Sequence, residues 1–284
     1  MGTADLAVIV CTRNRAKQLE RMLESLRFLK TDRSWELIVV NSASTDTTDE
    51  VINQFAASFP RQVVHVVTEK PGLGLARNAG LRATSARIVL FTDDDCYPSP
   101  DWLDKTCLCF EEDGELGVVG GRILLHDPRD YPITIQLKAE AERFRARSLV
   151  IPGVLQGANL SFRRDALDSV HGFDARLGSG TPFSCEDIDV VARISAAGWA
   201  VAYDPRPTVS HHHGRRMPED VAKLIVSYDH GRGAFYAKML ADRRVRLLYA
   251  RRWLLTIKHS PLRCTRRELA GAIRFAWTSL FDRI

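Results

Sequence analysis

The chain has 284 residues and a mass of 31.9 kDa, and it is 45% hydrophobic and 26% charged, with a net charge of +5. Its size suits one large domain, and its composition excludes wholesale disorder. Its apolar runs are far shorter than the roughly 20 residues of a membrane-spanning helix, and its N-terminus reaches Asp5 without the apolar stretch of a secretory signal.

The first 95 residues alternate between strand and helix patterns. Continuous apolar runs predict strands, and apolar positions at helical spacing predict helices. The strands are expected at residues 6–11, 37–40, 63–67 and 87–92, with helices at residues 15–28, 46–59 and 74–84. Strands that are apolar throughout are typical of parallel sheets covered on both faces. The pattern therefore predicts an open, Rossmann-like α/β sheet with right-handed crossovers.

The rhythm changes after residue 95. We expect helices at residues 101–110, 134–147 and 186–197, strands at residues 117–125, 155–162 and 199–203, and a mostly helical chain from residue 218 to residue 281. The sequence predicts one mixed α/β domain over residues 1–214, in two parts (1–95 and 96–214). A helical, basic region follows over residues 215–284.

Three adjacent carboxylates, Asp93, Asp94 and Asp95, directly follow the fourth predicted strand. Ligands of open α/β sheets bind at the carboxyl ends of strands. Adjacent carboxylates repel one another, and a divalent cation such as Mg²⁺ or Mn²⁺ removes that cost. In an extended segment Asp93 and Asp95 point to one side and Asp94 to the other. The alternative is an acidic turn or helix cap.

A run of three histidines, residues 211–213, follows the last predicted strand. In an extended segment His211 and His213 share a face, and neutral imidazole is a suitable ligand for Mn²⁺. The alternative is a polar loop.

The sequence resembles the inverting family-2 glycosyltransferases of the GT-A fold. The segments that carry the resemblance occur in the family's order over about residues 6–213. They are residues 8–15, residues 41–46, Gly72 to Gly80, Asp93–Asp95 followed by Pro98 to Leu103, residues 157–159, residues 172–174, and Glu186 to Gly198 with Arg193. Each segment alone is weak evidence for the family. Together the segments are specific for the family, but they do not identify the substrate.

The resemblance implies that residues 1–95 form the nucleotide-sugar-binding half of the domain and residues 96–214 the acceptor-side half. It also implies roles for particular residues. The donor-binding residues would be Thr12, Arg13, Asn14, Asn41, Asp46, Arg77, Asp93 and Asp94. The metal ligands would be Asp95, Asp93 and a histidine, His211 in preference to His213. The acceptor-binding residues would be Trp102, Asn159 and Glu186. The general base would be Asp187, assisted by Glu186.

One position departs from the family pattern. The second-strand motif usually begins with Asp, which contacts the nucleobase, but this chain has Asn41. An amide offers hydrogen-bond donors as well as an acceptor. The nucleotide of the sugar donor therefore stays open among UDP, dTDP and GDP. The alternative role of Asn41 is that of a turn residue at the strand end.

These roles predict a metal-dependent glycosyltransferase. A cation on Asp95 and Asp93 would stabilise the diphosphate leaving group, and Asp187 would accept the proton of the acceptor hydroxyl. The acceptor could be a glycan, a lipid-linked molecule or a small molecule. Two other functions stay open: a nucleotidyltransferase or phosphohydrolase that uses the acidic cluster, and a non-catalytic nucleotide-sugar-binding protein. The acidic residues near Asp187 could also merely complement a helix dipole.

The charge is concentrated at the C-terminal end. Residues 211–284 carry 16 Lys/Arg against 6 Asp/Glu, whereas residues 1–210 carry 24 against 29. Leu247, Leu248, Trp253, Leu254 and Leu255 lie among arginines. This stretch either packs on the catalytic domain, which the sequence favours, or lies on a membrane and presents a lipid-linked acceptor.

Two further expectations concern partners and location. Nucleic acid is not expected, because no recognisable binding module accompanies the basic charge. Six cysteines without disulfide or zinc-site spacing favour reduced thiols. We therefore expect a cytoplasmic protein, with contact at the inner membrane face if the basic region binds lipid.

Overall fold

A nine-stranded sheet forms the centre of the computed structural model, which describes residues 4–281, with side chains to residue 278. The strands are β1 (Leu6–Thr12), β2 (Trp35–Ser42), β3 (Val63–Thr68), β4 (Ile88–Asp93), β5 (Cys96–Pro98), β6 (Leu116–Leu125), β7 (Glu142–Phe144), β8 (Asn159–Arg163) and β9 (Ala200–His211). Their order is β3-β2-β1-β4-β8-β6-β9-β5, and β7 pairs with β9.

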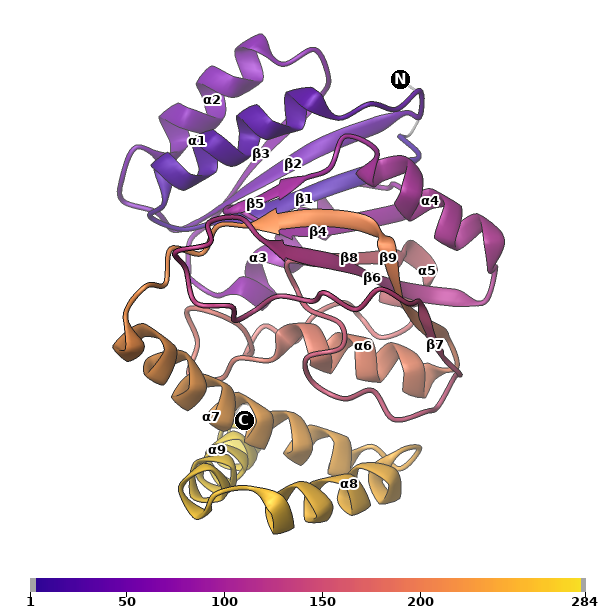
Figure 1. Ribbon diagram of the computed structural model, residues 1–284, viewed down its shortest axis with the longest axis vertical. Coiled ribbons are helices and arrows are strands. Elements are labelled where there is room, and N and C mark those ends of the chain that lie inside the picture. The colour runs from indigo at the N-terminus through magenta and orange to yellow at the C-terminus, as the bar shows by residue number, and fades with distance from the viewer. Residues whose placement is uncertain (1–3, 282–284) are drawn as a thin grey trace.

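Helices cover both faces of this sheet (Figure 1). They are α1 (Ala16–Ser25), followed by the 3-10 turn η1 (Leu26–Phe28), α2 (Thr48–Ser58), α3 (Leu73–Arg82), α4 (Trp102–Glu112), α5 (Arg164–Asp168), α6 (Glu186–Ala197), α7 (Pro218–Ala241), α8 (Arg246–His259) and α9 (Leu262–Phe281). The mixed α/β sheet and the helical C-terminal region confirm the predicted fold class.

The first four strands of the sheet are parallel, as their apolar sequences predict. Alternate residues of β1 face opposite ways. Val8 packs in a cluster with residues of α1 and α2, whereas Ile9 packs in a second cluster with residues of α3 and α6. All residues of the strand except the half-buried Cys11 are therefore buried, which explains its unbroken apolar sequence.

The second half of the sheet is mixed. Strand β8 is antiparallel to β4 and to β6, and β9 is parallel to β6. The strand predicted at residues 199–203 continues to His211, which pairs with Cys96 of β5. The strand predicted at residues 155–162 is limited to β8. The longer β9 matters for the site, because it brings His211 to the residues that follow β4.

The helix predicted at residues 134–147 is wrong. The segment is an irregular loop with the short strand β7, and Gln136 forms a bridge to Ile123. Its Ala, Glu and Arg content favours a helix, but the exposed edge of β9 offers backbone pairing to residues 142–144. Tertiary pairing therefore overrides the weak local propensity.

Helices α7, α8 and α9 pack beside α6, on the side away from the sheet (Figure 1). Phe235, Tyr236 and Tyr249 belong to the same buried cluster as the core residues of α6. Of the five residues in the predicted amphipathic stretch, Trp253 packs against this cluster, whereas Leu247, Leu248, Leu254 and Leu255 are exposed. The predicted packing on the catalytic domain therefore holds for Trp253 and not for the four leucines. The division at residue 214 stays a prediction, and residues 1–3 and 282–284 lie outside the described residues. Within residues 4–281, none of the helices has the length and apolarity needed to cross a membrane.

Candidate active site

A cleft of about 840 Å³ opens at the carboxyl ends of β1 and β4. Its walls come from several parts of the chain: the end of β1, the start of α3, residues 93–95, the loops at residues 152–158 and 178–185, and the start of α6. His211, Arg215 and residues of α7 close the remaining side. The cleft therefore lies where open α/β sheets bind ligands, and the C-terminal helices contribute to it.

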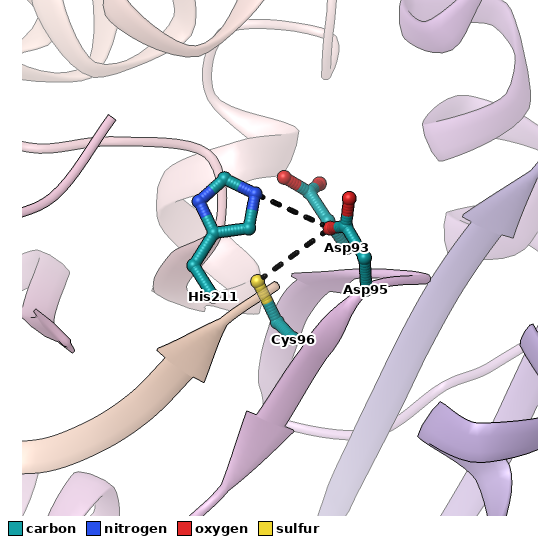
Figure 2. Close-up of side chains that lie close together, drawn as sticks. All are labelled: Asp93, Asp95, Cys96 and His211. Atoms are coloured by element: carbon teal, nitrogen blue, oxygen red, sulfur yellow. Dashed lines mark hydrogen bonds and ion pairs between the residues drawn. The ribbon is translucent and has the colours of Figure 1, made fainter. Parts of the chain in front are cut away.

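The acidic cluster and one histidine meet in this cleft. Ligand atoms of Asp93, Asp95, Cys96 and His211 all lie within 4.8 Å of one another (Figure 2). His211 Nε2 is 3.3 Å from Asp95 Oδ1. Burial raises the pKa of the Cys96 thiol well above its usual range, so this sulfur remains a neutral thiol. Two carboxylates and an imidazole are suitable ligands for Mn²⁺ and Mg²⁺.

His213 lies outside this group. Its Nε2 is 3.0 Å from the carbonyl of Tyr131, and its Nδ1 is 3.8 Å from Asp130. Strand β9 ends at His211, so the alternation that would place both imidazoles on one face does not continue. The structure brings only His211 of the two predicted histidines to the acidic cluster.

Arg15 holds two of the carboxylates. Its Nη1 is 2.9 Å from Asp94 Oδ1, and its Nη2 is 2.5 Å from Asp95 Oδ2. The hydroxyl of Thr12 donates to Asp94 Oδ2 at 2.6 Å. Burial raises the pKa of Asp94 to about 7. Burial also acts to raise the pKa of Asp95, but His211 and Arg15 outweigh it and hold that pKa well below its usual range.

Arg77 connects the acidic cluster to the second acidic motif. Its Nη1 is 3.2 Å from Glu186 Oε1, and its Nη2 is 3.6 Å from Asp93 Oδ1. Nη2 also donates to the carbonyl of Gly157 at 3.2 Å. A Cβ on Gly157 would lie 2.8 Å from this nitrogen, so a larger residue here would force the guanidinium to shift.

Glu186 and Asp187 begin α6 and face the cleft. The amide of Gly157 donates to Asp187 Oδ2 at 2.9 Å, and the amide of Ile188 donates to Oδ1 at 2.8 Å. Burial, together with the charge of Asp187, raises the pKa of Glu186 to about 7. The half-exposed Asp187 carboxylate is thus held by two backbone donors at the cleft wall.

Three predicted donor-site residues build the loops rather than line the cleft. Asn14 accepts from the amide of Thr45 at 2.7 Å, and Asp46 accepts from the amide of Ala16 at 3.1 Å, at the start of α1. Asn41 is buried, and its Nδ2 donates to Asp49 at 2.7 Å. Thr12 and Arg13, in contrast, line the cleft.

Trp102 and Asn159 are part of the buried interior. Trp102 Nε1 donates to Asn159 Oδ1 at 2.9 Å, and Asn159 Nδ2 donates to the carbonyls of Arg122 and Pro207. Both side chains are almost fully buried, and neither lines the cleft. The prediction that they contact an acceptor is not supported, because their polar atoms are already satisfied within the protein. They connect α4, β6, β8 and β9.

The sequence did not single out several residues that line the cleft. Arg15 lies in one of the segments that carry the family resemblance, but its place in the sequence does not indicate that its side chain reaches Asp94 and Asp95. Arg215 and four residues of α7, Leu224, Ser227, Tyr228 and Arg232, also line the cleft.

Known proteins with similar sequences are glycosyltransferases. The chain is 25% identical over 246 residues to glycosyltransferase AglE of Haloferax volcanii, covering 86% of this chain and 78% of the relative. It is 29% identical over 250 residues to the pre-mycofactocin glycosyltransferase of Mycobacterium tuberculosis, but this region is 48% of that protein's length.

Solved structures agree on the fold. The mannosyltransferase PcManGT of Pyrobaculum calidifontis, in complex with GDP-Man and Mn²⁺, has a TM-score of 0.66 at 19% identity, covering 98% of this chain and 88% of the other. S. aureus TarS 1-349 in complex with UDP-GlcNAc has a TM-score of 0.64 at 18% identity, covering 95% and 80%. At this identity the likeness shows the GT-A fold alone.

A family model also matches the sequence directly. The model described as "Glycosyl transferase family 2" matches residues 7–170. This range includes the acidic cluster and ends before α6. Because the match covers more than half of the chain, the protein belongs to glycosyl transferase family 2.

Proposed function

We propose that this protein is a metal-dependent, inverting glycosyltransferase that moves a sugar from a nucleoside-diphosphate donor to an acceptor hydroxyl. The observation that carries the proposal is the position of Arg77, which contacts Asp93 on one side and Glu186 on the other. The acidic cluster and the Glu186–Asp187 pair therefore face one cleft. A nucleotidyltransferase or phosphohydrolase would not need the second pair.

Asp95, Asp93 and His211 would hold Mn²⁺ or Mg²⁺. When bound, the cation would stabilise the charge that develops on the diphosphate leaving group. Two solved structures with the same fold support a nucleotide-sugar donor and a divalent cation here, because one has GDP-Man and Mn²⁺ bound and another has UDP-GlcNAc bound. Thr12, Arg13 and Arg77 would contact the donor directly. Asn14, Asn41 and Asp46 would shape its loops.

Asp187 would act as the general base. It would accept the proton of the acceptor hydroxyl, whose oxygen attacks the anomeric carbon opposite the leaving group. The new bond forms as the bond from the anomeric carbon to the diphosphate oxygen breaks. A single displacement of this kind inverts the configuration. The two amides that hold Asp187 fix the direction of its free lone pairs.

The decisive experiment compares Asp187→Asn with the unchanged protein. We expect sugar transfer to fall at least a hundredfold, whereas the affinity for the donor diphosphate with Mn²⁺ changes less than threefold. Retained turnover in this variant would contradict the mechanism. If the unchanged protein binds the diphosphate but turns over no acceptor of a broad panel, the non-catalytic binding function replaces the proposal.

We further propose that α8 and α9 contact an anionic membrane surface. Residues 243–278 contain ten Lys/Arg and one carboxylate, Glu268, which is buried. Large apolar side chains are exposed on both helices, including Leu247 at 79% and Trp277 at 60%. Exposed apolar groups among cations are typical of helices that lie in a lipid interface. One relative is named "Glucosyl-dolichyl phosphate glucuronosyltransferase", which supports a lipid-linked acceptor.

Vesicle flotation tests this contact. The full chain should float with vesicles that contain 30% phosphatidylserine and should not float with neutral vesicles. Leu247→Ser combined with Leu254→Ser should reduce flotation, whereas Phe28→Ser, which removes an exposed apolar group of the opposite end, should not. Equal flotation of all three proteins would contradict the proposal.

A further inference from the structure

Five arginines line the cleft, and they differ in their partners. Arg15 is paired with Asp94 and Asp95, Arg77 with Asp93 and Glu186, and Arg232 with Asp229 and Glu268. Among the described residues, no carboxylate lies within ion-pair distance of Arg13 or Arg215. Arg13 is exposed on the donor loop, whereas Arg215 is half-buried. The charge of Arg215 is therefore the one that the fold both shields from water and leaves unneutralised.

Arg215 also has an unused donor. Its Nη1 is out of contact with water and has no hydrogen-bond partner within residues 4–281. Buried donors are almost always satisfied, and a cation without a counter-charge is costly to shield. A ligand that enters the cleft could supply the missing acceptor.

The backbone holds Arg215 in place before any ligand arrives. The amide of Tyr131 donates to the carbonyl of Arg215 at 2.9 Å, and the amide of Arg215 donates to His213 Nδ1 at 3.0 Å. The next residue, Arg216, pairs with Asp127 and Asp130. The position of Arg215 is thus fixed from both sides, which lowers the ordering cost of binding.

Arg215 lines the same cleft as Asp187, the proposed base. Tyr228, on α7, is close enough to both Arg215 and Asp187 for their charges to act on its phenol. Burial raises the pKa of Tyr228 above its usual range, so its hydroxyl stays protonated and can donate. Ser227, which precedes it, also lines the cleft.

We infer that Arg215, together with Tyr228 and Ser227, forms a binding site for a phosphate group at the acceptor side of the cleft. A guanidinium and two hydroxyls supply donors from several directions, which suits the oxygens of a phosphate. The cleft is otherwise acidic at Asp93–Asp95 and at Glu186–Asp187. A phosphorylated acceptor would be repelled there without an unneutralised cation. This inference rests on the proposed function for its two substrates.

The phosphate could belong to the acceptor or to the donor diphosphate, and two titrations separate these sources. The first measures the affinity for the nucleoside diphosphate with Mn²⁺. The second adds phenyl phosphate to protein already saturated with that diphosphate and Mn²⁺, so that the donor side is filled. The proteins are the unchanged chain, Arg215→Ala, Arg215→Lys and, as a matched control, Arg21→Ala on the exposed face of α1.

We expect Arg215→Ala to lower the affinity for phenyl phosphate at least tenfold. Arg215→Lys should cause a smaller loss, and Arg21→Ala should cause none. Affinity for the diphosphate should stay within twofold. A tenfold loss in the first titration would instead assign the phosphate to the donor. If Arg215→Ala keeps its melting temperature and neither titration changes, the inference is overturned. Failure of the unchanged chain to bind any nucleoside diphosphate with Mn²⁺ would contradict the proposed function separately.

Discussion

Arg77 and Glu186 form an ion pair across the floor of the cleft, with 3.2 Å between Nη1 and Oε1 and with Arg77 only 2% exposed. The pair joins α3, which follows the third parallel strand, to the first residue of α6. Phe91 and Phe173 pack against the guanidinium, with centroids 5.6 and 5.4 Å from its central carbon. A cation shielded in this way holds together two halves of the site that are more than a hundred residues apart in the sequence.

Replacing Arg77 should therefore destabilise the protein. Arg77→Met leaves Glu186 buried without its counter-charge, and breaking such a pair costs about 3–5 kcal/mol. We expect a loss of this size in the free energy of unfolding, measured with urea. Arg33→Met removes an exposed pair with Glu111 and should cost less than about 1 kcal/mol. Equal losses in both variants would show that Arg77 is not a structural link.

The histidines offer a matched test of the metal site. His211→Ala removes a predicted ligand beside Asp95, so Mn²⁺-dependent binding of the diphosphate should weaken about tenfold or more, as loss of a metal-site partner typically does. His213→Ala should leave it within threefold, since His213 contacts Tyr131 and Asp130 instead. Calorimetric titration with and without chelator measures both. A larger effect of His213→Ala would contradict the assignment.

The metal-free protein should lose stability as the pH rises from about 4.5 to 7. The pKa values of Asp94 and Glu186 are raised to about 7 from ordinary values of 3.8 and 4.5. These groups bind their protons more tightly when folded, so their contribution is present at low pH and is lost as they ionise. A tenfold difference in proton affinity between the folded and unfolded chains corresponds to about 1.4 kcal/mol of stability.

Melting temperatures in chelator at pH 5, 6 and 7 check this dependence. We expect a steady fall, which Asp94→Asn should flatten because the amide does not titrate. Asp95 has a lowered pKa instead, and its contribution is lost only below about pH 4, outside the measured range. A melting temperature that rises between pH 5 and 7 would refute the prediction.

Asn159 should matter for stability and not for acceptor binding. Asn159→Ala leaves the indole of Trp102 and the carbonyls of Arg122 and Pro207 without partners. Unsatisfied buried groups cost about 1–3 kcal/mol each, so urea denaturation should show a clear loss. The KM for acceptor should change less than twofold in the folded fraction. A raised KM at unchanged stability would restore the acceptor role that the sequence suggested.

Local patterns were enough to predict the parallel half of the sheet. Strands β1, β2 and β4 are largely buried, and the partly buried edge strand β3 still has a mostly apolar sequence, so their sequences alone identify them. The mixed half depends on pairing between distant segments, which explains why residues 134–147 were assigned to a helix and why β9 was predicted to end well before His211.

The candidate site also contains residues whose place the sequence predicts and residues whose place it does not. Asp93 and Asp95 follow a predicted strand and Asp187 begins a predicted helix, so their position in the chain already indicates where they lie. The place of His211 depends instead on the continuation of β9 beyond its predicted end. Trp102 belongs to a recognised motif, but a motif does not tell whether a side chain faces the cleft or the core. The contributions of Arg15 and Arg215 depend on where their long side chains end, which no local pattern specifies.

Strand β9 makes the candidate site sensitive to a single inserted or deleted residue. It pairs with β5, β6 and β7 along twelve residues and ends at His211, opposite Cys96. Side chains alternate along a strand, so a shift of one residue would turn the imidazole to the other face of the sheet. Many substitutions within β9 could preserve that orientation, but a change of one residue in its length could not. The number of residues in this strand, more than their identity, sets where the histidine points.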